Sequence, residues 1–167
     1  DCYLKTNAKR SARAAFESAS RMNYNPFITE ESKFAYLKLS YELSYQSVAV
    51  TACRTFLKEY PESAHTGEAN EILINIYAST RNYRDALEAL ESIKVKTPGM
   101  KAAYQKVAYY RAIELYMDND LAQSAQLLQT SLGNPVDQRI TAEAHYWKGE
   151  IAYKQSKFDQ AVKSYND

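Results

Sequence analysis

Residues 49–61 read AVTACRTFLKEYP, and residues 86–98 read ALEALESIKVKTP. Each stretch runs from an alanine to a proline twelve residues later. The two alanines lie 37 residues apart, and so do the two prolines, which recur a third time at Pro135. Small residues continue the alanine series in both directions, at Ala12, Ser124 and Ala161. The interval from Ala86 to Ser124 is one residue longer than the others. A fixed period of this length is typical of stacked repeats, so the sequence predicts a solenoid.

Each period contains two expected helices. Apolar residues in 31–60 recur at intervals of three and four, with an interruption at 44–46, and this is helical spacing. The same plan predicts helices at 8–21, 68–79, 83–94, 101–117 and 121–132, and on both sides of 156–157 in the range 138–167. Pro61 and Pro98 are expected to end helices, because proline cannot continue one. The paired acids Glu30 and Glu31 are expected at a helix start, where carboxylates favour the helix dipole.

Composition and charge exclude several classes of function. The 21 Lys and Arg residues are balanced by 20 Asp and Glu, which leaves a net charge of +1. A nucleic-acid-binding protein concentrates positive charge on one face, so we expect no nucleic-acid partner. No apolar run approaches the roughly 18 residues of a membrane-spanning helix, so we expect no direct membrane insertion. The two cysteines, Cys2 and Cys53, do not indicate a disulfide framework.

The C-terminal residues resemble a known family. Residues 142–149 (AEAHYWKG), followed by Tyr153-Lys154-Gln155, Phe158 and Ala161, resemble the tetratricopeptide repeat (TPR) consensus. In that consensus a small residue of the first helix faces an alanine of the second, and here the pairs are Gly149/Ala161 and Ala112/Ser124. The resemblance covers nearly the whole chain and implies an all-α, right-handed α-α superhelix. The chain departs from the family at Leu37 and Ile74, which replace the small residue, and its period of 37 exceeds the usual 34.

The period divides the chain into one array of three complete repeats between two partial ones. Residues 1–4 are then the tail of a first helix, and the last helix lacks its final turn. We therefore expect this chain to be a segment of a longer protein. The expected divisions are a partial repeat at 1–30, repeats at 31–67, 68–104 and 105–141, and a partial repeat at 142–167.

A finer resemblance concerns the first complete repeat. Residues 56–63 (FLKEYPES), followed by Glu68-Ala69, resemble bacterial cell-envelope TPR proteins. The outer-membrane barrel-assembly lipoproteins and the TolA-binding cell-division coordinator are examples. This resemblance implies a periplasmic or outer-membrane-associated location in preference to the cytoplasm.

The family register also implies a partner-binding surface on the concave wall, which the first helix of each pair lines. Tyr109 and Tyr116 are seven residues apart, as are Tyr146 and Tyr153, so each pair shares one helix face. Tyrosine favours binding because it buries a large area and keeps a hydroxyl for hydrogen bonding. The same rings can instead fill space between adjacent first helices. The predicted groove residues are Phe34, Lys38, Tyr41, Asn75, Tyr109, Tyr116, Tyr146, Glu150 and Tyr153.

Motifs for catalysis or cofactor binding are missing from the sequence. His65 and His145 lie on different repeats, whereas metal ligands cluster at short spacing. No glycine-rich phosphate loop or nucleophile motif occurs. The sequence therefore predicts a non-catalytic scaffold, without metal or cofactor, that binds a protein or peptide in the concave groove. Two alternatives stay open: a structural spacer that positions flanking domains, and an accessory domain of an envelope enzyme.

Overall fold

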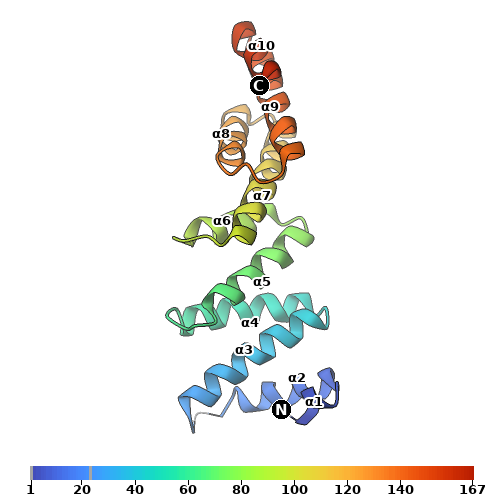
Figure 1. The fold of residues 1–167 in the computed structure, drawn as a ribbon, viewed down its shortest axis with the longest axis vertical. Helices are drawn as coiled ribbons and strands as arrows, with labels where there is room; N and C mark the ends of the chain where they lie inside the picture. Colours follow the sequence, from blue (N-terminus) through green and yellow to red (C-terminus); the bar gives the residue numbers. More distant parts are fainter. Residues whose placement is uncertain (1, 23) are drawn as a thin grey trace. The chain divides into compact units, whose positions relative to one another are not determined.

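The computed structural model describes residues 2–22 and 24–167, and every regular element within these ranges is an α-helix (Figure 1). This confirms the all-α fold class that the sequence predicts. The helices are α1 (Cys2–Lys5), α2 (Lys9–Ala19), α3 (Pro26–Glu42), α4 (Gln46–Glu59), α5 (Thr66–Ser79), α6 (Tyr83–Ser92), α7 (Pro98–Met117), α8 (Leu121–Leu132), α9 (Gln138–Lys154) and α10 (Phe158–Asn166).

One backbone turn recurs after every odd-numbered helix. A single residue in each turn has a positive φ, and these residues follow one another at the 37-residue period, with one interval of 38. Because left-handed backbone is costly for residues other than glycine, its recurrence shows that the same turn is built repeatedly. We call the odd-numbered helix before each turn the A helix and the one after it the B helix. The turn residues are Asn7 (55°), Ser44 (62°), Arg81 (58°), Asn119 (63°) and Ser156 (58°).

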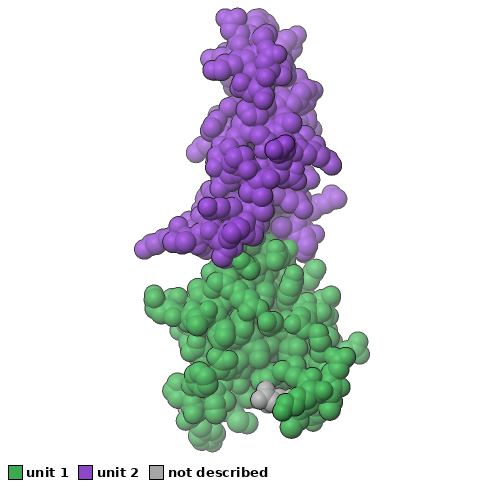
Figure 2. Space-filling model, in the orientation of Figure 1, with its two compact units in different colours: residues 1–76 green, residues 77–167 purple. Residues whose placement is uncertain are grey.

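The chain divides into two compact units, residues 1–76 and 77–167 (Figure 2). In unit 1, α2 packs against α1 and α3, and α3 packs against α4. The core of this unit contains Leu37, Ala49, Cys53 and Phe56, none of which exceeds 1% exposure. The ladder alanine at position 49 therefore lies at a buried helix contact, and burial raises the pKa of the Cys53 thiol to about 12.

In unit 2, each helix from α6 to α10 packs against the next, and α7 also contacts α9. The Ser124 hydroxyl donates a hydrogen bond to the Ala112 carbonyl at 2.8 Å, and both residues are fully buried. Two helices can approach closely only where small side chains meet. The predicted Ala112/Ser124 pair is therefore such a crossing, between α7 and α8.

Two helices begin earlier than the sequence pattern indicates. α3 begins at Pro26 rather than near residue 31, and α7 begins at Pro98 rather than near 101. Asn25 caps α3 by accepting from two backbone N–H groups, and Thr97 caps α7 in the same way with one. A proline suits the first helical position, where its missing N–H is not needed. Pro98 therefore starts a helix rather than ending one, while α4 does end before Pro61 as expected.

The acidic pair in α3 is also placed differently from the sequence interpretation. Glu30 and Glu31 lie inside α3, more than a turn beyond its first residue, and not at its start. The glutamate at position 31 instead lies 2.7 Å from His65 Nε2.

Candidate protein-binding site

Four of the five tyrosines predicted to line a groove lie on α7 and α9 of unit 2. α9 begins at a well-defined cap, in which the Asp137 carboxylate accepts from the N–H groups of Arg139 at 2.9 Å and Ile140 at 3.3 Å. Gln105 of α7 is fully buried and bonds the backbone of Asp137 on both its N–H and its carbonyl. These contacts fix α9, and with it the direction of its side chains, relative to α7.

The two α7 tyrosines predicted to line the groove are both buried. Tyr109 is 6% exposed and Tyr116 is 9% exposed. The ring of Tyr116 meets Trp147 of α9 edge-on, with ring centroids 4.9 Å apart. Burial, together with a hydrogen bond to Glu143 of α9, raises the pKa of Tyr109 to about 12. These two rings therefore fill the space between neighbouring A helices.

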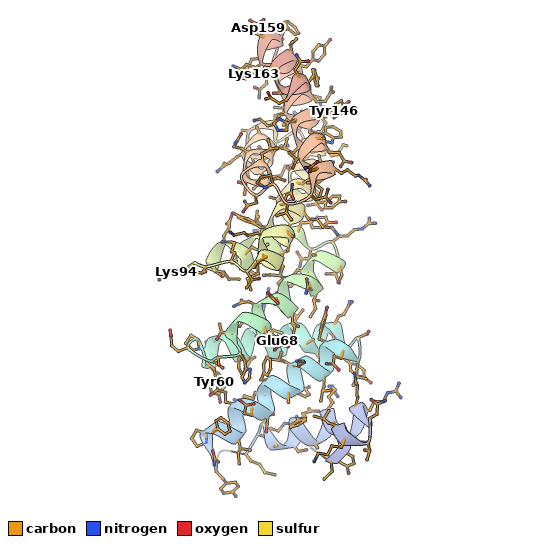
Figure 3. The ribbon with its side chains drawn as sticks, in the orientation of Figure 1. Tyr60, Glu68, Lys94, Tyr146, Asp159 and Lys163 are labelled. Carbon is orange, nitrogen blue, oxygen red and sulfur yellow. The ribbon has the colours of Figure 1, made fainter. Side chains whose placement is uncertain are left out.

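Both tyrosines on α9 are exposed. Tyr146, labelled in Figure 3, is 51% exposed, and Tyr153 is 59% exposed. Glu150 lies between them and accepts a hydrogen bond from the Tyr165 hydroxyl of α10 at 2.7 Å. That hydrogen bond, with a smaller contribution from burial, raises the pKa of Tyr165 to about 12. One face of α9 thus presents two exposed rings on either side of a carboxylate.

A cation lies beside this face. The Lys154 ammonium lies 4.0 Å from the centroid of the Tyr116 ring, a distance typical of cation–π contact. Met117, which follows this tyrosine at the end of α7, is 67% exposed. We call Met117, Tyr146, Glu150, Tyr153 and Lys154 the A-helix face of unit 2. It combines apolar contact area with one charge of each sign.

Two of the four predicted groove residues of unit 1 are engaged within the fold, and two are exposed. Phe34 is 7% exposed and stacks on His65, with ring centroids 4.0 Å apart and planes at 11°. The Lys38 ammonium lies 2.7 Å from a carboxylate oxygen of Glu68, which Figure 3 labels. Tyr41 is 37% exposed, and Asn75 is exposed on α5. In unit 1, therefore, Phe34 is packed and Lys38 is paired, while Tyr41 and Asn75 remain exposed.

Sequence reasoning missed a shallow hollow of about 470 Å³ in unit 1. Its floor includes Phe56, its rim carries Lys33, and hydroxyl side chains from successive turns of α4 line one side: Ser47, Thr51 and Thr55. The Lys33 ammonium is already paired with Glu59, and this hydrogen bond raises the pKa of the lysine. The hydroxyl series was visible in the sequence, but its position beside a hollow depends on the packing of α2 and α3.

Comparisons with known proteins agree with the repeat geometry. Residues 109–167 match the tetratricopeptide repeat family. Two solved structures are similar over 98% of this chain and 85% of theirs, each at 17% identity: the MamA RS-1 ArsTM double mutant, with a TM-score of 0.55, and MamA 41-end from Desulfovibrio magneticus RS-1, with a TM-score of 0.50. The chain has a tetratricopeptide repeat fold. A comparison with curated protein sequences gave no match.

The described residues contain neither a metal-binding cluster nor a membrane-spanning helix. No three His, Cys, Asp or Glu side chains in the ranges 2–22 and 24–167 are grouped closely enough to hold a metal ion. In the same part of the chain, no helix combines the length and the apolar character that crossing a membrane requires.

Proposed function

We propose that this TPR chain is a non-catalytic scaffold that binds a peptide or helix of another protein, and that the A-helix face of unit 2 makes the contact. The observation that carries the proposal is the exposure of Tyr146 and Tyr153, at 51% and 59%, on one face of α9. Exposed tyrosine and methionine are enriched at the centres of protein interfaces, and charged side chains are typical of the rim around them.

The buried members of the predicted set support this face rather than touch a partner. The Lys154 ammonium lies over the ring of Tyr116, which packs on Trp147. Tyr109 forms a hydrogen bond with Glu143. Their substitution would disturb the packing of α7 on α9. The direct contacts that we propose are therefore the five side chains of the A-helix face: Met117, Tyr146, Glu150, Tyr153 and Lys154.

The chemistry of the face defines the partner segment. Two rings seven residues apart on a helix can hold two apolar side chains of a docked segment about 10 Å apart. Lys154 lies at one end of the A-helix face and can attract a carboxylate of the partner segment. Glu150 lies between the two rings and can accept a hydrogen bond from a donor of that segment. We therefore propose that the partner segment carries two apolar anchor residues and an acidic residue near one of them. We expect few other charged residues in it.

Affinity capture tests this function. The whole chain is used as bait against envelope and cytosolic extracts of its source, beside a Tyr146→Ala/Tyr153→Ala variant. A Tyr3→Ala/Tyr24→Ala variant, which removes two exposed rings from unit 1, is the matched control, and circular dichroism verifies that all three proteins are folded. Loss of one partner in the first variant alone supports the proposal. No partner, or equal capture by all three proteins, overturns it and favours the spacer alternative.

A further inference from the structure

The hollow in unit 1 lies among three helices of that unit. α2 and α4 both pack against α3 (Figure 1). Ser20 at the end of α2, Tyr36 of α3 and Phe56 of α4 all line the hollow, and every lining residue falls within the range 20–56. Its volume of about 470 Å³ is within the range of roughly 300–1,000 Å³ that is typical of ligand-binding sites.

A row of hydroxyl groups forms one side of this hollow. Ser47, Thr51 and Thr55 are spaced by four residues, so they lie on one side of α4 and extend over about 12 Å. All three residues are exposed. The Thr51 hydroxyl donates to the Ser47 carbonyl at 3.0 Å, which leaves its oxygen free to accept. Because a hydroxyl both donates and accepts, the row can pair with N–H and with C=O groups. We call these three residues the hydroxyl row.

The repeat architecture does not require hydroxyl groups at these positions. The counterparts 37 residues later, on α6, are Arg84, Glu88 and Ser92, and all three are also exposed. Threonine is less favourable in a helix than arginine or glutamate, because its branched side chain loses freedom there. Thr51 and Thr55 therefore neither fill the core nor favour the helix. Local choices that oppose the fold in this way are expected at functional sites.

The rest of the hollow is apolar and carries no unbalanced charge. Phe56 is buried, and Val48 and Ala52 beside it are half-buried. Among the described residues that line the hollow, Lys33 alone is charged, and its ammonium is paired with Glu59. A bound group with a charge of its own would lose water without gaining a free counter-charge. The hollow therefore suits a neutral group with apolar side chains and backbone-like polar atoms.

We infer that the hollow binds an extended, uncharged peptide segment of a partner protein. One edge of an extended chain presents the N–H and C=O groups of every second residue, which repeat at about 6.7 Å. The hydroxyl row repeats at about 6 Å, close enough for side-chain rotation to bring each hydroxyl to a backbone group. Alternate side chains of the segment then enter the hollow, so that main-chain hydrogen bonds give affinity and the pocket gives specificity.

An extended segment fits this surface better than a helix does. The backbone groups of a helix are already paired with each other, so a docked helix would leave the hydroxyl row without backbone partners. An extended chain arrives with unpaired N–H and C=O groups, which need partners when water is removed. This site goes beyond the proposed function, because it lies on α2, α3 and α4 of unit 1 and shares no residue with the A-helix face.

A phage-displayed library of random linear dodecapeptides is the probe. The whole chain is the bait, and each round is depleted on Thr51→Glu, a residue type that the repeat already accepts at Glu88. We expect an enriched consensus of uncharged residues with apolar side chains at i and i+2. Gln46→Glu adds the same charge at an exposed position of α4 outside the hollow. This matched control should retain the selected peptides, and circular dichroism verifies that all the variants are folded.

A synthetic consensus peptide then tests the hydroxyl contacts by fluorescence anisotropy. Thr51→Val/Thr55→Val keeps the shape of the surface but removes two hydroxyls, and we expect binding to weaken by about tenfold. Thr51→Ser/Thr55→Ser keeps the hydroxyls and should bind nearly as the wild type does. Methylating every second backbone nitrogen of the peptide should weaken binding in one of the two possible registers, because only one edge faces α4.

Three outcomes overturn the inference. The first is that no peptide is enriched over the Thr51→Glu variant. The second is a consensus with apolar residues at i and i+4, which would identify a helix as the occupant. The third is binding to the valine variant that is as tight as binding to the wild type, which would show apolar contact without backbone recognition. All variants retain Tyr146 and Tyr153, so a failure here and a failure of the capture experiment are distinguishable.

Discussion

Gln105 of α7 bonds the backbone of Asp137 from both sides: its Oε1 accepts from the Asp137 N–H at 2.6 Å, and its Nε2 donates to the Asp137 carbonyl at 2.9 Å. The same amide also accepts from the Val136 N–H and donates to the Thr141 hydroxyl, each at 3.0 Å. A fully buried side chain thus fixes the residue that caps α9, the helix that carries the A-helix face.

The first prediction follows from this contact. Gln105→Leu keeps most of the side-chain volume but removes all four hydrogen bonds of the amide. Because the backbone groups at the α8–α9 connection lose their partners, we expect a loss of about 2–4 kcal/mol in the free energy of unfolding. Urea denaturation measures it. Gln126→Leu, at an exposed position on α8, should change stability by less than about 0.5 kcal/mol, and similar losses in both variants would contradict the assignment.

A second prediction concerns the ladder of small residues. Ala86 of α6 is fully buried, whereas Arg84 on the same helix is exposed. Ala86→Leu forces extra volume into a close contact, which should cost about 1–3 kcal/mol. Arg84→Leu adds a similar apolar group on the surface and should leave the melting temperature nearly unchanged. Thermal denaturation compares the two variants, and equal melting temperatures would show that the ladder does not mark close contacts.

The recurring turn gives a third prediction. Arg81 has φ = 58° between α5 and α6, a conformation that costs a non-glycine residue about 1–2 kcal/mol. Arg81→Gly removes this strain. Glycine also makes the unfolded chain more flexible, and the greater entropy lost on folding offsets part of the gain. We expect a net stabilisation of roughly 0.5–1 kcal/mol. Arg84→Gly, the same change within α6, should instead destabilise the protein, so the two variants should move the unfolding midpoint in opposite directions.

Features that depend on neighbours in the sequence were predictable. The period, the turn positions near 44, 81, 119 and 156, and the small pair Ala112/Ser124 follow from residue types at short spacing. Pro98 was misread because a proline fits both just after one helix and at the first position of the next. The capping residue Thr97 was the signal that could have distinguished the two cases.

Features that depend on distant packing were not predictable in the same way. The partners of Gln105 lie 26 to 36 residues away in the sequence, and nothing local marks this glutamine as buried. Tyr109 and Tyr146 occupy the same place in the repeat pattern, yet one is buried and the other exposed. The difference arises because α9 covers α7, so the sequence register could nominate both rings but could not separate the packed ring from the exposed one.

The last prediction concerns Glu143, which joins α9 to α7. Its hydrogen bonds with Arg139 and then with Tyr109 lower the pKa of this carboxyl below its usual value. A lowered folded-state pKa stabilises the fold above the unfolded pKa, and this contribution is lost as the pH falls through the folded pKa. We therefore expect Glu143→Gln to destabilise the protein at pH 7. Since the carboxylate is partly solvated, the loss should be below about 1 kcal/mol.

The difference between wild type and variant should disappear at an acidic pH below the folded-state pKa of Glu143, where the glutamate is protonated in both states. Urea denaturation of both proteins at the two pH values measures it, since the other carboxylates contribute equally and cancel. Glu88→Gln, a charge-matched change at an exposed position on α6, is the control for the loss of one negative charge. A destabilisation by Glu143→Gln that is the same at both pH values would show that the side chain acts through its shape rather than through its charge.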